Sequence, residues 1–146
     1  MIELLVIGFA LAVYAVLILG TFTHRILMTC SGGTGNGLQG AISGTGTEER
    51  NISIALDAGT DVLVPYTLDV SQVQSVFILV DTDALLEVNS SSAPPRALSL
   101  KAGEPVAWSA NYDSDITNPL GSTDITALYM TNAAACQFEL RVTVNS

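Results

Sequence analysis

Apolar residues follow two patterns along this chain: one continuous run at the start, then short alternating runs. The continuous run covers residues 2–22 and carries a single charge, Glu3. As a helix it would extend about 31 Å at ~1.5 Å per residue, close to the hydrocarbon thickness of a bilayer. We therefore expect residues 1–22 to form an apolar, helical N-terminal segment that serves as an anchor or a buried arm.

The charges around this run argue against a cleaved secretory signal. Such a signal needs a basic region before its apolar stretch, whereas here the early charge is acidic and His24 and Arg25 follow the run. Basic residues after a membrane-spanning segment tend to stay in the cytoplasm. Membrane contact through residues 2–22 and burial of the same residues against other subunits both remain open.

Residues 23–146 carry the pattern of a β-sandwich domain. Ile52, Ile54 and Leu56 alternate with polar or small residues, as in a half-buried strand. No amphipathic segment of helical length interrupts these runs, which predicts an all-β fold: a single antiparallel β-sandwich, jelly-roll or Ig-like. The expected strands lie within residues 50–56, 60–68, 73–81, 84–89, 96–100, 105–110, 124–131 and 137–144.

Local signals refine this outline. A glycine-rich joint is expected at residues 31–40. Pro65 lacks a backbone donor, so its strand should lie at a sheet edge or contain a bulge. The stretch at 75–80, which shows no alternation, predicts a central strand covered on both sides. A turn containing Gly103 and Pro105 predicts a hairpin over residues 98–108.

Length and charge limit the classes of function. With 146 residues, the chain can form one domain with a real core. Its 14 Asp and Glu against 5 Lys and Arg give a net charge of −9, which repels phosphate backbones. We therefore expect no nucleic-acid partner.

No combination of residues forms a clear catalytic set. His24 is the one histidine, and it sits beside the apolar run instead of beside a candidate nucleophile. The carboxylate pairs Asp81/Asp83 and Asp113/Asp115 flank turn-rich segments, where solvated loop carboxylates are the usual case. The sequence thus predicts a protein that is not an enzyme and that needs no cofactor.

Two further groups of residues could bind a metal or form a covalent link. Asn111, Asp113, Asp115 and Asn118 bring several oxygen ligands into one loop and are weak candidates for calcium, although the spacing is not that of an EF-hand. No other metal site is expected. Cys30 and Cys136 could form a disulfide in an oxidising compartment or stay as free thiols.

The region from Thr23 onward resembles a family of small β-rich virion structural proteins of tailed bacteriophages, related to head decoration proteins. The resemblance follows the order of "THRILMTCSGG", "SGTGTEERNISIAL", "NSSSAP", "LKAGEPVAW" and "NPLGSTDITALYMTN" along the chain. It covers about five sixths of the chain and carries no functional residues across. The apolar leader departs from that family, whose members begin near the Thr-His-x-Ile strand.

A shorter resemblance concerns the start of the chain. "IELLVIGFALAV" is similar to the N-terminal helix of type IV pilins, whose apolar stems pack into a filament core. Pilins, however, carry a basic leader and continue the helix well beyond residue 20. The glycine-rich stretch follows soon after that point here.

These observations predict a non-enzymatic virion structural protein that decorates or cements a phage capsid through subunit interfaces. Its expected location is the capsid surface of the virion, its expected partners are other virion proteins, chiefly the major capsid protein, and it should form a homo-oligomer. The alternative is a membrane-anchored or pilin-like filament subunit at the cell surface with an exposed β-rich head.

Overall fold

A computed structural model of the chain describes residues 20–30, 38–111 and 115–146. These residues form eleven β-strands and one short 3₁₀ helix, η1. The apolar run at 2–22 lies almost wholly outside the described residues. The elements are β1 (Phe22–Cys30), β2 (Leu38–Gly46), β3 (Glu48–Glu49), β4 (Ile52–Leu56), β5 (Gly59–Val64), η1 (Val70–Gln72), β6 (Val73–Val80), β7 (Ala84–Val88), β8 (Arg96–Leu100), β9 (Val106–Ser109), β10 (Leu128–Asn132) and β11 (Cys136–Val144).

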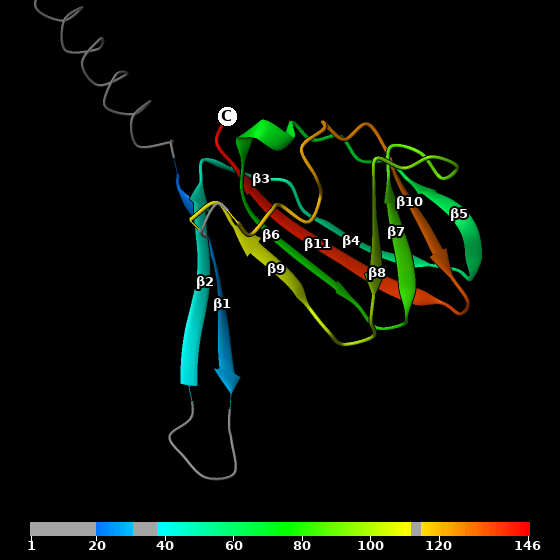
Figure 1. Ribbon diagram of the computed structural model, residues 1–146, viewed down its shortest axis with the longest axis horizontal. Helices are drawn as coiled ribbons and strands as arrows, with labels where there is room; N and C mark the ends of the chain where they lie inside the picture. Colours follow the sequence, from blue (N-terminus) through cyan, green and yellow to red (C-terminus); the bar gives the residue numbers. More distant parts are fainter. Residues whose placement is uncertain (1–19, 31–37, 112–114) are drawn as a thin grey trace, which may run out of the picture.

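Two antiparallel sheets make the body of the molecule (Figure 1). One sheet has the order β3-β11-β6-β9, and β4 continues the β3 edge along the same side of β11. The other sheet has the order β5-β10-β7-β8. The predicted all-β sandwich is therefore confirmed.

The strand order is that of a jelly roll. β7 pairs with β8, β6 with β9, β5 with β10 and β4 with β11, so the chain from β4 to β11 is one long antiparallel hairpin rolled into two sheets. In an Ig-like sandwich, whose strands are lettered A to G in chain order, one sheet contains A, B, E and D and the other contains C, F and G. Of the two sandwich types expected from the sequence, the topology selects the jelly roll.

Alternation in the two longest body strands fills the core. Phe138, Leu140 and Val142 of β11 and Val76 and Ile78 of β6 are each at most 1% exposed. Each such side chain stabilises the fold by about 1.5–3 kcal/mol relative to an exposed position. Both sheets contribute to the core. The facing sheet supplies Leu86 from β7 and Leu128 and Met130 from β10.

Two local predictions agree with the sheet order. β5 is an edge strand and ends at Val64, directly before Pro65. β6 lies inside its sheet, between β11 and β9.

The hairpin predicted for residues 98–108 is wrong. β8 pairs with β7 in one sheet and β9 pairs with β6 in the other, so the turn at 101–105 crosses from sheet to sheet. A turn sequence shows that the chain reverses but not which strand the next run will join. In this fold β8 pairs with the preceding strand, β7, and β9 pairs with β6, as the nested strand pairs of the jelly roll require.

β1 and β2 form a separate two-stranded antiparallel sheet, here called the arm. The arm packs across β11, β6 and β9 at one end of their sheet and then projects past the body (Figure 1). Residues 38–40, expected in the glycine-rich joint, belong to β2, and residues 31–37 lie outside the described part. Backbone pairing with β1 supplies the order that the glycine content alone does not.

Candidate functional site

The base of the arm covers a row of small polar side chains on the outer face of the β11-β6-β9 sheet. Thr143, Ser75 and Ser109 stand opposite one another on the three strands, so they share this face. They are 0%, 4% and 1% exposed, and the Oγ atoms of Ser75 and Thr143 lie 2.7 Å apart. Polar side chains that a two-layer sandwich would leave in solvent are thus buried by a third layer.

Glycines allow the arm to approach this row closely. A Cβ added at Gly44 would lie 2.4 Å from Cβ of Ser75, and one at Gly46 would lie 2.4 Å from the carbonyl oxygen of Val144. Any side chain at these two positions would push the arm away from the sheet. Gly40 differs, because nothing lies within 4 Å of its added Cβ.

Hydrogen bonds fix the arm in this position. The hydroxyl of Ser109 donates to the carbonyl oxygen of Ser43 at 2.6 Å. The backbone N–H of Thr47 donates to the carbonyl oxygen of Val144 at 2.8 Å. The arm is therefore held by main-chain and side-chain contacts as well as by shape.

His24 takes part in the same contact and forms a triad-like arrangement. Its Nε2 lies 2.7 Å from Oε1 of Glu49, and its Nδ1 lies 3.4 Å from Oγ of Ser75. A hydrolase would need the serine oxygen open to a substrate. Ser75 is instead 4% exposed, bonded to Thr143 and covered by Gly44. The arrangement is suited to holding the arm on the body, not to attacking a substrate.

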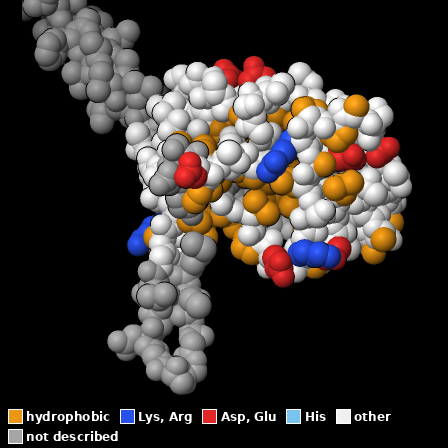
Figure 2. Space-filling model, in the orientation of Figure 1, with side chains coloured by type: hydrophobic (Ala, Val, Ile, Leu, Met, Phe, Trp, Pro, Cys, Tyr) orange, Lys and Arg blue, Asp and Glu red, His pale blue; other side chains and the backbone are white. Residues whose placement is uncertain are grey.

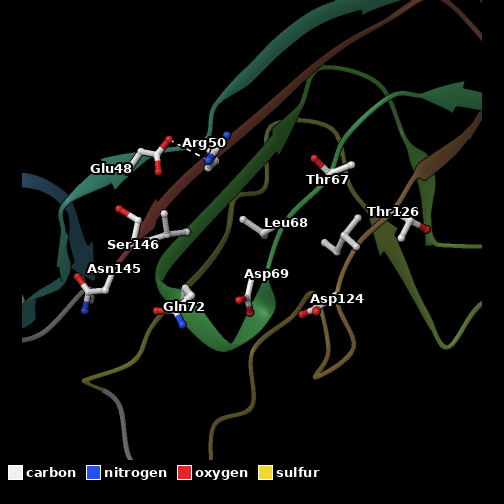
Figure 3. A pocket seen from close by; sticks show the side chains of 12 residues that line it. Glu48, Arg50, Thr67, Leu68, Asp69, Gln72, Asp124, Thr126, Asn145 and Ser146 are labelled. Carbon is white, nitrogen blue, oxygen red and sulfur yellow. Dashed lines mark ion pairs between the residues drawn. The ribbon is translucent and has the colours of Figure 1, made fainter.

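A pocket of about 570 Å³ lies beside the arm base, at the β3 edge of the sandwich (Figure 3). Its floor is apolar: Leu68 and Ile125 exchange backbone hydrogen bonds of 2.9 Å, and both are buried, as is Val144. Loops, η1 and the chain's last residues contribute the rim. A concave pocket with an apolar floor is a candidate binding site.

The rim of this pocket is polar and carries three acidic side chains and one basic one. Glu48 forms an ion pair of 2.9 Å with Arg50, which leaves Asp69 and Asp124 as further carboxylates. Neither Asp69 nor Asp124 belongs to any ion pair among the residues that the structure describes. Each uses Oδ1 to accept a backbone hydrogen bond of 3.0 Å, Asp69 from Ser71 and Asp124 from Val70. The rim thus presents two anchored negative charges.

Tyr66 holds the backbone of Arg50, one of the residues that line the pocket. Its hydroxyl donates to the carbonyl oxygen of Arg50 at 2.7 Å, at the break between β3 and β4. Burial raises the pKa of Tyr66 far above its ordinary value, and the nearby Arg50 offsets this only in part. The protonated phenol is therefore the form that the folded chain requires.

The loop proposed for calcium is used for other contacts where it is described. Asn111 donates its side-chain amide to the carbonyl oxygen of Ser43 at 3.3 Å, and Oδ1 of Asn118 accepts the N–H of Leu120 at 2.9 Å. Asp115 lies on this loop, and Asp113 lies outside the described residues. Across the described ranges, no three His, Cys, Asp or Glu side chains are grouped to hold a metal ion. Calcium binding that depends on Asp113 stays a prediction.

The Asp81/Asp83 pair acts in turn formation. Oδ1 of Asp81 accepts the N–H of Gln137 at 2.7 Å, and Asp83 pairs with Lys101 at 2.6 Å and accepts the N–H of Ala102. These hydrogen bonds hold the pKa of the Asp83 carboxyl below its ordinary value. Each of the two carboxylates therefore stabilises a different turn, and the two do not act as a pair.

Cys136 is a free, buried thiol at the start of β11. Its Sγ donates to the carbonyl oxygen of Thr82 at 3.7 Å, and burial raises its pKa. The side chain of Cys30 lies outside the described part, so the possible disulfide between Cys30 and Cys136 stays a prediction. Cys30 ends β1, whereas the arm packs against the other end of β11, near Thr143.

Sequence reasoning missed both the arm and the pocket. A signal for the arm was present: Gly44 and Gly46 lie on the same face of one strand, and glycine inside a strand often marks the close approach of another backbone. Nothing comparable marked the pocket, because its rim comes from four separate parts of the chain.

The comparisons with known proteins give no further assignment: no family model, curated protein or solved structure matches the chain. Within the described residues, no helix is long and apolar enough to cross a membrane.

Proposed function

We propose that this chain is a non-enzymatic structural protein of a phage virion, which decorates or cements the capsid through subunit interfaces. The observation that carries the proposal is the arm, which leaves the jelly roll and extends past it (Figure 1). A two-stranded hairpin is marginally stable alone in water, so its projecting part gains stability from a partner. Jelly rolls are common among viral capsid domains, which supports this setting by analogy of fold alone.

The surface suits assembly on a crowded shell. In Figure 2, acidic side chains are spread around the outline of the body, and apolar side chains gather near the middle of the face shown. Net negative charge keeps assembled particles from sticking to one another. Apolar areas framed by polar residues are typical of protein interfaces.

Capsid reinforcement requires interface area instead of catalysis. Specific interfaces bury on the order of 1,600 Å², and a decoration protein forms such contacts many times over one shell. A projecting arm increases the reach of each copy across a junction between capsid subunits. Residues 2–22 would be buried against neighbouring subunits, because so many exposed apolar residues exceed what a soluble monomer tolerates.

Co-expression tests this function. The full chain would be produced together with the major capsid protein encoded nearest to it, and the particles would be sedimented and imaged. We expect the chain to sediment with the particles at a fixed ratio to capsid subunits and to raise their thermal midpoint. Particles that form normally and bind none of the chain would contradict the proposal.

The apolar run at 2–22 favours a second candidate, a membrane-anchored or pilin-like filament subunit. The same cells distinguish the two functions. An anchored subunit would partition into the membrane fraction and need detergent for release, both with and without the capsid protein. A virion protein would leave the membrane fraction when capsids are present.

A further inference from the structure

The charges of the chain are divided between the arm and the body. Of all the Asp and Glu residues, only Glu3 precedes Glu48, so the arm carries no acidic residue. It carries Arg25 and His24, while the other Lys and Arg residues all lie from Arg50 onward among the acidic residues of the body. The arm of one copy is thus complementary in charge to the body of another.

Alternation directs two exposed side chains of the arm away from its own body. His24 faces the sheet and contacts Ser75, so Arg25 and Leu27, at odd positions of β1, lie on the opposite face. Arg25 is exposed, and Leu27 is 69% exposed, the highest fraction among the large hydrophobic residues described. Among the residues that the structure describes, no surface of the same copy covers this leucine and guanidinium, which lie two residues apart.

The pocket offers the matching surface. Its floor of Leu68, Ile125 and Val144 is apolar, and Asp69 and Asp124 lie close together on its rim without an ion pair among the described residues (Figure 3). A leucine side chain would bury apolar surface against such a floor, and a guanidinium would form charge-assisted hydrogen bonds with two adjacent carboxylates. The oxygen Oδ2 of each aspartate is not used by the backbone hydrogen bonds that fix Oδ1.

We propose that the outer face of the arm, through Leu27 and Arg25, docks into the pocket of a second copy of this chain. Leu27 contacts the apolar floor, and Arg25 pairs with Asp69 and Asp124 of the neighbour. Because arm and pocket are different surfaces, the contact is head-to-tail and leaves one arm and one pocket open after each step. Such contacts close into a ring or continue as an open array. The proposal does not depend on the virion setting.

Single-surface variants of the full-length chain give the first test, with the assembled mass measured by analytical ultracentrifugation in a mild detergent of known micelle mass. Arg25→Glu/Leu27→Asp is expected to convert the assembly into monomer. Asp69→Asn/Asp124→Asn keeps the oxygen acceptors of the pocket rim but removes both charges, and it should weaken association at least tenfold. Leu63→Asp is the matched control, because Leu63 is also exposed, at 54%, but lies on the β5 edge.

Mixing the two variants gives the decisive test. The arm variant retains a normal pocket and the pocket variant retains a normal arm, so the mixture should form a one-to-one dimer that cannot grow. Alone, the arm variant should be monomeric and the pocket variant should associate at least tenfold more weakly than the native chain. Both should keep the circular dichroism spectrum of the native chain, which shows that they are folded. Assemblies that survive the arm variant, or a mixture that stays monomeric, would overturn the proposal.

The same variants separate this inference from the proposed function. If the arm binds a capsid protein and not a second copy, the native chain alone will be monomeric and the arm variant will lose binding to particles. That outcome would reject self-docking and leave the virion function standing. Self-association without particle binding would have the reverse meaning.

Discussion

At the scale of single residues, the most consequential positions are those that have no side chain. Gly44 and Gly46 allow β2 to lie directly against β6 and β11, and they place His24 within reach of Glu49. The buried hydroxyls of Ser75 and Thr143 then satisfy each other below the arm. Small size at two positions therefore decides whether the third layer exists.

Gly44→Ala should release or shift the arm. The new methyl group would overlap Ser75 and the backbone of Gln74, an overpacking cost of about 1–3 kcal/mol. Denaturant unfolding would measure the loss of stability, and hydrogen exchange would show faster exchange of the β2 amides. Gly40→Ala is the control in the same strand, because its Cβ meets open space, and it should change neither measurement.

At the scale of elements, each piece of the molecule depends on a neighbour distant in sequence. The arm is a hairpin that rests on β6, β9 and β11, which come from residues 73–144. The strand edge formed by β3 and β4 is broken at Arg50. There the hydroxyl of Tyr66 donates a hydrogen bond to the carbonyl oxygen of Arg50, in place of a bond from a neighbouring strand. A phenol near the end of β5 thus stabilises an edge of the opposite sheet.

Tyr66→Phe should lower stability at neutral pH by about 1 kcal/mol through loss of this hydrogen bond. The substitution should also change how the free energy of unfolding depends on pH. Because burial raises the pKa of Tyr66 above its unfolded value of 10.0, the native chain keeps the proton while the unfolded chain loses it. The free energy of unfolding is therefore constant below pH 10 for this group and falls above it.

Urea unfolding at pH 8 and at pH 11 would measure that difference. The native chain should lose more stability between the two values than the Tyr66→Phe variant does, since the other tyrosines are common to both. Equal losses would mean that the phenol is not protected in the folded chain.

At the scale of the whole molecule, nested strand pairs make the body one unit. β7 and β8 lie at the turn of the rolled hairpin, and β4 and β11 close it from the two ends of the body. Since β4 and β11 are far apart in sequence, the sheet edge forms only when most of the chain is in place. The body should therefore unfold cooperatively.

Phe138→Ala tests this cooperativity. The side chain is 0% exposed in β11, so its loss should cost about 3–5 kcal/mol by leaving a cavity. Fluorescence of Trp108, in β9, and exchange of the β10 amides, in the other sheet, should report the same midpoint before and after the change. Two separate midpoints would show that the sheets unfold independently.

How much the sequence could predict differs between the fold and the site. The alternating strands, the edge position of β5 and the inner position of β6 follow from residue types at fixed spacing, because a strand's period and the missing donor of Pro65 are local properties. The pairing of β8 and β9 with different strands is not local, and the predicted hairpin failed for that reason. The pocket was equally out of reach, because residues from 48 to 146 meet there.

The sequence by itself determined an acidic, all-β chain with an apolar start. Only the tertiary structure decided that the sheets form a jelly roll, that a glycine face carries the arm, and that Asp69 and Asp124 lie together at a pocket rim. The physical reason is that periodicity fixes which face of each strand is apolar, whereas the meeting of faces depends on how distant strands pair.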